Sequence, residues 1–390
     1  MRFAKRTNWN TEESELARAH RERLAAGEPL ADLTASNPTR CGFAYDAELL
    51  AALGDRRSLD YDPDPRGLRA AREAVCRYYA DHHSVGLTPE NVVLTTSTSE
   101  AYSFLFRLLC EPGDEVVTLV PGYPLFDFLA ALDDVVLKPV ALFYDHGWTL
   151  DHEALEQAVT ERTRAIVLVH PNNPTGHFTK EREREELGRI CRAKNVALIV
   201  DEVFLDYGLG EAEARSFAGG LQGAPVFVVS GLSKIAGLPQ MKSAWIAAAG
   251  EGMGEAMARL EVIADTFLSM NAPVQWAMPK WLEARRGIQG QMMGRVRANL
   301  AELDRQLGEQ KAVQRLVVEG GWYAVLRVPK LDPDERTVMN LLDRGAWVHP
   351  GYFFGMEEMG WLVVSLLGRE EEFKQGLKIV LGYFAGEPRK

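Results

Sequence analysis

Hydrophobic positions between residues 91 and 250 fall into short continuous runs, and most of these runs are separated by amphipathic stretches. Short apolar runs are typical of strands buried on both faces, whereas a stretch such as 180–194 has the spacing of a surface helix. The alternation predicts an α/β fold with a mostly parallel sheet covered by helices. The predicted strands are Val92–Thr95, Glu115–Val120, Val135–Pro139, Ala165–Val169, Val196–Val200, Val226–Val229 and Ala244–Ala248.

The pattern changes at both ends of this region. Residues 11–26 have the pattern of a helix, with Thr11 as its N-cap. After Pro273, a helical stretch runs to about residue 309, and its three glycines predict a kink or a break. Strand patterns at 320–326 and 361–366 and a helix at 369–384 then predict a smaller α+β unit.

Polar residues with catalytic potential follow the predicted strands. In sheets of this kind, ligands bind at the carboxyl ends of the strands. Asp201 alone could be a helix cap, Lys234 a surface lysine and Tyr123 a core aromatic. The residues found directly after the strands are Ser97, Thr98, Ser99, Tyr123, Asn173, Asp201 and Lys234.

Composition narrows the possible functions. The net charge of −11 argues against a nucleic-acid partner, because binding DNA or RNA needs a basic face. The four cysteines are widely scattered and His82-His83 has no recognisable partner, so we expect no metal site. The chain has no apolar run of eighteen residues, so we expect no membrane span. The basic N-terminus lacks an apolar signal core, and we expect a cytoplasmic enzyme.

Five motifs in a fixed order suggest a family. Together with Asn37-Pro38 and Tyr61…Gly67-Leu68-Arg69, the series resembles the class I/II aminotransferases, which are fold-type I pyridoxal phosphate enzymes. The motifs are Ser97-Thr98-Ser99-Glu100-Ala101, Pro121-Gly122-Tyr123-Pro124, Asn173-Pro174-Thr175-Gly176, Asp201-Glu202-Val203-Phe204 and Ser233-Lys234-Ile235-Ala236-Gly237.

The resemblance implies pyridoxal 5'-phosphate as cofactor and gives roles to single residues. Lys234 would form an imine with the coenzyme, and Asp201 would pair with its pyridinium nitrogen. Asn173 would bond the 3′ oxygen, and Tyr123 would stack on the ring. The residues implied around the phosphate are Ser97, Thr98, Ser99, Ser233 and Lys242.

The resemblance also implies an assembly and a domain division. Tyr61 would reach the phosphate in a neighbouring subunit, so we expect a homodimer with shared active sites. The family arrangement predicts a large coenzyme domain at 42–278. A small domain would combine 1–41 with 279–390.

Three positions depart from the family pattern. Phe204 stands where a tyrosine usually bonds the 3′ oxygen, and Lys242 replaces an arginine at the phosphate. Val363 occupies the position of the arginine that grips the substrate carboxylate, and valine cannot make that bidentate pair. Either Arg40, beside Asn37, substitutes for it, or the substrate lacks a free α-carboxylate. Arg369 and His349 are weaker candidates for this role.

These features predict an aminotransferase. It would transfer an amino group from an amino acid or a related amine to a 2-oxo acid through Lys234. The alternative is a lyase, decarboxylase or oxidase that uses the same coenzyme on the same fold. The choice depends on which bond at the substrate's α-carbon is broken, and the sequence does not identify the substrate.

Overall fold

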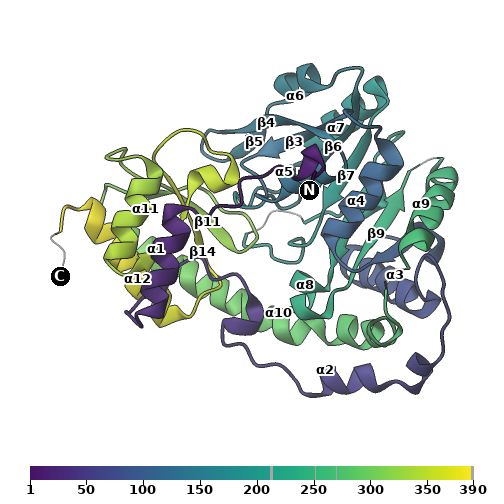
Figure 1. Ribbon diagram of the computed structural model, residues 1–390, viewed down its shortest axis with the longest axis horizontal. Helices are drawn as coiled ribbons and strands as arrows, with labels where there is room; N and C mark the ends of the chain where they lie inside the picture. The colour runs from purple at the N-terminus through teal and green to yellow at the C-terminus, as the bar shows by residue number, and fades with distance from the viewer. Residues whose placement is uncertain (211–213, 251, 269, 388–390) are drawn as a thin grey trace.

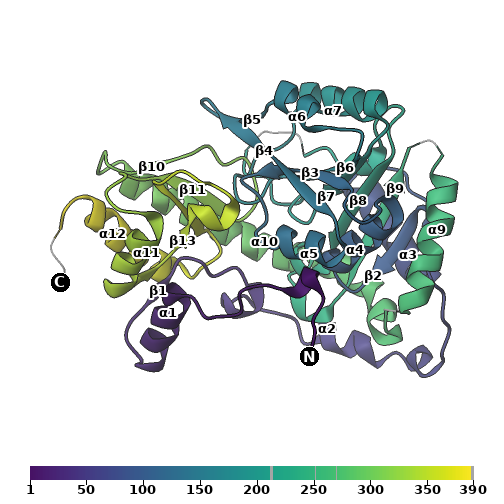
Figure 2. The same cartoon turned by 45° about the horizontal axis from the view of Figure 1, so that its top comes forward.

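A computed structural model describes residues 1–210, 214–250, 252–268 and 270–387. Figures 1 and 2 show a large sheet with helices on both faces and a smaller sheet with its own helices. The long helix α10 runs from the large sheet's helices to those of the small sheet, because it packs on α3 at one end and on α12 at the other. The helices are α1 (Glu15–Ala25), α2 (Glu48–Ala51), α3 (Arg69–His83), α4 (Thr98–Leu109), α5 (Phe126–Leu132), α6 (His152–Ala158), α7 (Glu181–Lys194), α8 (Leu232–Ile235), α9 (Met253–Phe267), α10 (Ala272–Leu307), α11 (Asp334–Asp343) and α12 (Glu370–Phe384).

The large sheet has eight strands in the order β2-β9-β8-β7-β6-β3-β4-β5. The run from β8 to β4 is parallel, whereas β9 is antiparallel to both of its neighbours and β5 is antiparallel to β4. Because β9 is reversed, β2 points the same way as β8. The strands are β2 (Val92–Thr95), β3 (Glu115–Val120), β4 (Val136–Tyr144), β5 (Trp148–Leu150), β6 (Thr163–Val169), β7 (Ala197–Asp201), β8 (Val226–Gly231) and β9 (Ala244–Ala249).

Successive residues of the central strands enter two different cores. On β6, Ile166 packs with residues of α3, α7 and α10, while Val167 packs with residues of α4, α5 and α9. On β7, Leu198 and Ile199 divide in the same way. This alternation follows from the period of two in a strand, and it explains why the runs are apolar throughout.

The small sheet has the order β10-β11-β14-β13 and is antiparallel. A separate parallel pair, β1 with β12, joins the N-terminal segment to the C-terminal part of the chain. The core of this region packs α1, α11, α12 and the C-terminal half of α10 around the small sheet. The strands are β1 (Ala31–Asp32), β10 (Gln314–Arg315), β11 (Tyr323–Arg327), β12 (Ala346–Trp347), β13 (His349–Pro350) and β14 (Trp361–Ser365).

Two of the predicted helices differ from the structure. Helix α1 begins at Glu15 and not near Thr11, because the hydroxyl of Ser14 accepts a hydrogen bond from the Ala17 N–H and caps the first turn. Helix α10 is one element of 36 residues, although a break was expected at its glycines. Packing along α10 keeps it helical, since its buried residues extend from Val274 to Gln306. No helix in the described part of the chain is long and apolar enough to cross a membrane.

Candidate active site

Strand direction gathers the predicted site residues at one edge of the large sheet. The last residues of β6 and β7, Val169 and Asp201, are paired, and the ends of β2 and β8 both pair with Ala244, the first residue of β9. Ser97, Tyr123 and Asn173 follow β2, β3 and β6 within a few residues, and Lys234 follows β8. Because β9 runs the opposite way, Lys242 precedes it at this same edge.

Asp201 lies in the interior with its carboxylate facing polar groups. Oδ1 accepts a hydrogen bond from the Val203 N–H at 3.0 Å, and Oδ2 accepts one from the Tyr102 hydroxyl at 3.2 Å. Burial raises the pKa of Asp201 to about 6, although both hydrogen bonds and the charge of Lys234 act in the opposite direction. No ion pair within the described residues involves Asp201. Its carboxylate is therefore held in place without a permanent cationic partner.

Lys234 lies in the short helix α8, directly after β8. Its backbone carbonyl accepts a hydrogen bond from the Tyr207 hydroxyl at 2.6 Å, and its Nζ lies 5.4 Å from the centre of the Trp322 ring. Burial lowers the pKa of Lys234, and the carboxylate of Asp201 opposes that shift. A lowered pKa leaves more of the amine unprotonated, which is the form that attacks a carbonyl.

Asn173 occupies a turn that its neighbour, Asn172, holds in place. Asn172 donates a hydrogen bond through Nδ2 to the Pro121 carbonyl at 3.2 Å and accepts one from the Thr175 hydroxyl at 2.8 Å. In contrast, Oδ1 of Asn173 is enclosed and has no hydrogen-bond partner among the described residues. A buried amide without a partner is costly, so this group indicates a missing ligand.

The segment after β2 has the features of an anion site. Ser97 caps α4 by accepting a hydrogen bond from the Glu100 N–H at 3.1 Å. The N–H groups of Thr98 and Ser99 lie in the first turn, where a helix has no acceptor for them, and both hydroxyls are close by. Ser233 is partly buried in α8, and Lys242 is exposed just before β9. This edge thus offers N–H groups, hydroxyls and one ammonium group to a phosphate.

Tyr123 lies at the same edge and is about a third exposed, at 36%. Burial and the charge of Asp201 both raise its pKa. Tyr323 of β11 lies nearby, since its pKa responds to Tyr123 and to a hydrogen bond with Ser36. The N-terminal segment therefore reaches the site at Ser36.

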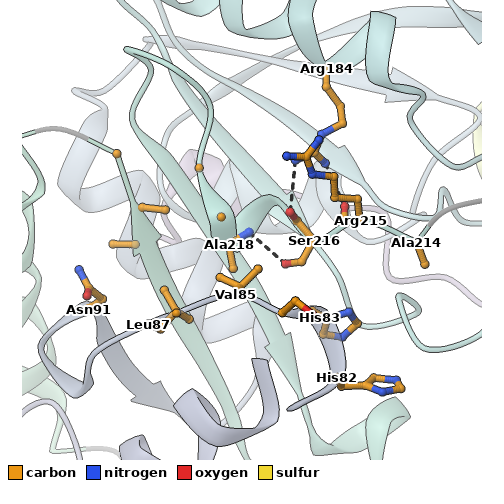
Figure 3. A pocket seen from close by; sticks show the side chains of 17 residues that line it. His82, His83, Val85, Leu87, Asn91, Arg184, Ala214, Arg215, Ser216 and Ala218 are labelled. Carbon is orange, nitrogen blue, oxygen red and sulfur yellow. Dashed lines mark hydrogen bonds between the residues drawn. The ribbon is translucent and has the colours of Figure 1, made fainter. Parts of the chain in front are cut away.

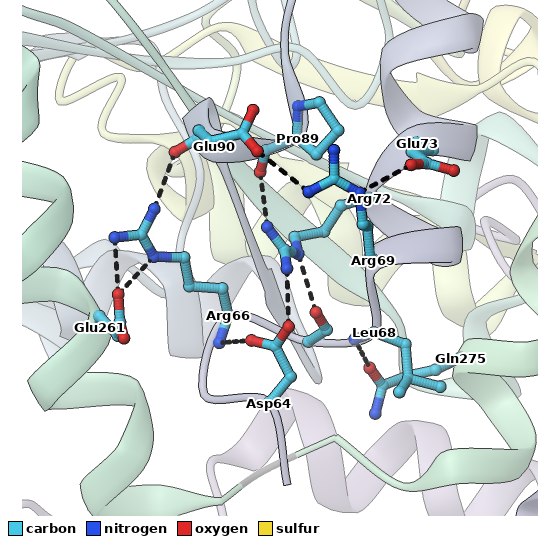
Figure 4. Close-up of polar contacts among 11 residues, drawn as sticks. Asp64, Arg66, Leu68, Arg69, Arg72, Glu73, Pro89, Glu90, Glu261 and Gln275 are labelled. Atoms are coloured by element: carbon cyan, nitrogen blue, oxygen red, sulfur yellow. Dashed lines mark hydrogen bonds and ion pairs between the residues drawn. The ribbon is translucent and has the colours of Figure 1, made fainter. Parts of the chain in front are cut away.

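Tyr61 precedes a turn that a network of ion pairs holds to helices α3 and α9 (Figure 4). Asp64 accepts a hydrogen bond from the Arg66 N–H at 2.9 Å and pairs with the Arg72 guanidinium at 2.7 Å. Arg66 in turn pairs with Glu261 of α9 at 2.6 Å. The Tyr61 side chain itself is 80% exposed, so within one chain it makes little contact with the rest of the site.

Asn37 and Arg40 lie in the N-terminal segment, one and four residues after Ser36. Asn37 Oδ1 accepts hydrogen bonds from the Thr39 N–H and hydroxyl, at 3.1 and 2.8 Å. The Arg40 side chain is exposed and makes no hydrogen bond or ion pair within the described residues. It is therefore a cation close to the site in sequence that is not committed to another carboxylate.

The position of the expected carboxylate-binding arginine is apolar in the fold. Val363 is completely buried in β14, between Val325 of β11 and His349 of β13. Burial lowers the pKa of His349 to about 4, so this imidazole is neutral near pH 7 and supplies no cation. The guanidinium of Arg369 packs over Gly42 instead.

Phe204 is also enclosed by aromatic rings. Its ring centre lies 5.1 Å from that of Trp322 and 6.0 Å from Lys234 Nζ. The nearest tyrosine in the sequence is Tyr207, and its hydroxyl donates a hydrogen bond to the Lys234 backbone carbonyl. Tyr207 therefore does not replace the hydroxyl that Phe204 lacks.

Sequence reasoning missed three residues at this site, namely Tyr102, Tyr207 and Trp322. Tyr102 is one helical turn beyond Thr98, so it belongs to a motif whose first residues were recognised. Trp322 follows two glycines, and Gly320 is packed against the Phe178 ring and the Tyr207 carbonyl, where a side chain has no room. That glycine pair before two aromatic residues is the signal that could have indicated a close approach of the two sheets.

The donors present fit pyridoxal phosphate. A buried carboxylate without a cationic partner suits a protonated ring nitrogen, and the Asn173 amide, whose enclosed Oδ1 has no partner among the described residues, carries in Nδ2 the donor that a ring oxygen would need. The first turn of α4 suits a phosphate.

Comparison with known proteins gives one family. A model of the family described as "Aminotransferase class I and II" matches residues 23–380. The chain is 28% identical over 321 residues to the aspartate/prephenate aminotransferase of Thermus thermophilus, an alignment that covers 80% of each protein. It is 25% identical over 248 residues to nicotianamine aminotransferase 1 of Oryza sativa, covering 62% of this chain but only half of the rice protein.

A solved structure extends the likeness to the fold. The alanine aminotransferase of Pyrococcus furiosus superposes with a TM-score of 0.90 over 99% of this chain and 100% of that chain. The two sequences are 22% identical, so this likeness establishes the fold alone.

Proposed function

The chain belongs to the aminotransferase class I and II family, and we propose that it is a pyridoxal phosphate-dependent aminotransferase. It transfers an amino group from an amino acid or a related amine to a 2-oxo acid. The observation that supports this best is the pair formed by Asp201 and Lys234. Burial shifts the pKa of the acid upward and that of the amine downward at the same edge of the sheet.

When bound, pyridoxal phosphate supplies an aldehyde that takes up the amino group and a ring that withdraws electrons from the reacting carbon. Tyr102 and the Val203 N–H orient the Asp201 carboxylate, which would hold a proton on the ring nitrogen of the bound coenzyme. The unprotonated Nζ of Lys234 would be the nucleophile toward the coenzyme's aldehyde. Once displaced by the substrate's amino group, the same Nζ would be free to accept the proton from the substrate's α-carbon.

The remaining residues hold and orient the coenzyme. Thr98 and Ser99 contribute the N–H groups and hydroxyls for the phosphate, with Ser97, Ser233 and Lys242 around them. Asn173 would donate to the ring oxygen through Nδ2, and Tyr123 would cover one face of the ring. Phe204 gives no second donor at that oxygen, so Asn173 is the only side chain we assign to it.

Arg40 is our candidate for the substrate carboxylate, with the amide nitrogen of Asn37 beside it. Arg40 is uncommitted, and Val363 rules out the usual strand position. A lyase, decarboxylase or oxidase is less favoured, because most of the compared relatives are named as aminotransferases, although one is named as a lyase.

We also propose a homodimer with a domain division near residues 42 and 278. Tyr61 and its neighbour Leu59 are 80% and 83% exposed, and Leu268 lies beside the same small cavity as Tyr61. A second subunit would cover these apolar side chains and receive the Tyr61 hydroxyl at its phosphate.

Trapping the coenzyme on the protein tests the site. The coenzyme-loaded protein is reduced with borohydride and digested, and the pyridoxyl group is located by mass spectrometry. We expect it on the peptide that contains Lys234, and we expect Lys234→Ala to lose it while Lys194→Ala, at the exposed end of α7, keeps it. A pyridoxyl group on a different lysine in the wild-type protein would refute the assignment.

A further inference from the structure

A group of potential metal ligands lies where α3 ends, apart from the Lys234 site. His82 and His83 face Asp206, with Nε2 of each ring at 3.4 and 3.1 Å from the same carboxylate oxygen, Oδ1. The expectation that this histidine pair has no partner is therefore wrong. Asp206 was not recognisable as the partner because it follows His83 by 123 residues and reaches the histidines through the fold.

The hydrogen bonds around Asp206 are unevenly distributed. Oδ1 accepts from the Tyr78 hydroxyl at 2.8 Å and also faces both imidazoles, whereas Oδ2 accepts only from Gln289 at 2.5 Å. Tyr78 Oη and His83 Nε2 are themselves 3.0 Å apart. A carboxylate oxygen has about two lone-pair positions, so three donors compete for one oxygen.

The charge of Asp206 has few cationic partners. Its side chain is 1% exposed, and among the described residues its only ion-pair partners are the two histidines, which are cations only when they are protonated. Arg285 stacks on the Tyr78 ring at 5.0 Å and donates to the Leu282 carbonyl, so it is not paired with Asp206. A buried carboxylate that attracts several donors has the electrostatic environment of a cation site.

We propose that His82, His83 and Asp206 bind a divalent transition-metal ion of the zinc type. Two imidazole nitrogens and one carboxylate oxygen are a typical zinc donor set, and all three ligand atoms lie within 4.8 Å of one another. With bonds of about 2.0–2.2 Å in a tetrahedron, the ligand atoms stand roughly 3.3–3.6 Å apart. The His82 nitrogen-to-Oδ1 distance of 3.4 Å lies in that range, and the His83 distance of 3.1 Å is slightly shorter.

Gln289 of α10 supports this site from behind. Its hydrogen bond to Oδ2 fixes the carboxylate so that Oδ1 faces the histidines. A partner that orients a ligating carboxylate is a regular feature of protein metal sites. A bound ion would also replace the competing protons on Oδ1 with a single cation.

The site opens to solvent at its two histidines, whereas the Asp206 side chain is buried. Both histidines line a cleft of about 780 Å³, and Figure 3 shows their rings on one side of it, with Arg184 and Arg215 on the other. The guanidinium of Arg184 is occupied by the carbonyls of Arg215 and Ser216. Three protein ligands leave a fourth position, which water or a small anion from this cleft would fill.

The ion would join α3 to the segment that follows β7. Asp206 lies five residues after Asp201, and Gln289 belongs to the long helix α10. Metal binding would therefore stabilise the region behind the proposed coenzyme site, without contact with the reacting atoms.

Zinc titration of the whole protein tests the proposal. The coenzyme-loaded protein is stripped of metal with a chelator, desalted to remove free coenzyme, and titrated with a zinc salt against a chromogenic chelator. The variants are His82→Ala, the double variant His82→Ala with His83→Ala, and His146→Ala as a control, because the His146 side chain is 99% exposed and far from the cleft residues in sequence. His82 is 35% exposed, so its replacement leaves the core intact.

We expect one zinc ion per chain in the wild-type protein and in His146→Ala. His82→Ala should weaken binding by at least about tenfold, and the double variant should lose the site. Zinc should also raise the unfolding temperature of the wild-type protein but not that of the double variant, since a ligand stabilises only the state that binds it. The proposal is overturned if the wild-type protein binds no zinc, or if the double variant binds it as tightly as the wild type.

Discussion

Replacing Asp201 with asparagine should reveal the energetic cost of keeping this carboxylate in place for the coenzyme. In the coenzyme-free protein, the Asp201 carboxylate is buried and has only two hydrogen bonds and the charge of Lys234 to stabilise it. Asparagine has nearly the same shape but no charge. The Asp201→Asn variant should therefore gain stability relative to the wild type as the pH rises.

The magnitude follows from the pKa. An aspartate in an unfolded chain titrates near about 3.9, and the folded-state pKa of Asp201 is about 6. The folded protein thus binds the proton more tightly than the unfolded chain. The free energy of unfolding of the wild type therefore falls as the pH rises from the unfolded-state pKa to the folded-state pKa, and it is constant at higher pH. The complete difference of about two pKa units corresponds to about 3 kcal/mol. About 1.4 kcal/mol of it should develop between about pH 5 and 7.5, on the upper part of the titration.

Urea unfolding of the coenzyme-free proteins at several pH values measures this difference. The stability of Asp201→Asn minus that of the wild type should rise by about 1.4 kcal/mol from about pH 5 to 7.5. Asp145→Asn, at a side chain that is 74% exposed, should show no such change. Glu202, with its pKa of about 7, adds a pH dependence of its own; because the charge of Asp201 contributes to raising that pKa, removing the charge in Asp201→Asn changes the difference in the same direction. A constant difference between wild type and Asp201→Asn across this range would refute the reasoning.

Three further substitutions test other contacts. Tyr102→Phe removes a hydrogen bond to the Asp201 carboxylate and should raise the pKa of Asp201 by about one unit; an unchanged pH profile of stability would show that the bond contributes nothing. Arg40→Ala should raise KM for a carboxylate substrate by about tenfold or more, while Arg18→Ala on exposed α1 should not, and equal steady-state kinetics for both would remove Arg40 from the site. Phe204→Tyr adds a buried hydroxyl and should destabilise the coenzyme-free protein by about 1–3 kcal/mol. Adding coenzyme should restore the unfolding temperature of this variant. An equal loss of stability with and without coenzyme would mean that the hydroxyl meets no ring oxygen.

The sheet was predictable from the sequence because its strands are buried on both faces. Val92–Thr95 and Glu115–Val120 agree with the structure residue for residue. The sequence did not reveal that β9 is antiparallel, since a buried strand has the same apolar pattern in either direction. That reversal matters, because it brings Lys242 to the edge where Ser97 and Lys234 lie.

The residues after the strands were predictable, but their partners were not. Asp201 and Lys234 stand at strand ends that can be recognised one by one. The contacts of Tyr102 with Asp201 and of Trp322 with Lys234 join segments about 100 and 90 residues apart, and no local pattern encodes them. The same holds for Asp206, which lies in the turn after β7 while its histidine partners lie at the end of α3.

The half-reaction with an amino donor tests the central claim most directly. The visible spectrum of the pyridoxal phosphate-loaded protein is recorded as amino acids and simple amines are added one at a time, without an oxo acid. An aminotransferase should convert the yellow coenzyme to the pyridoxamine form with at least one donor, and a 2-oxo acid should restore the yellow form. A coenzyme that never reaches the pyridoxamine form with any donor, or is not restored by any oxo acid, would contradict the account.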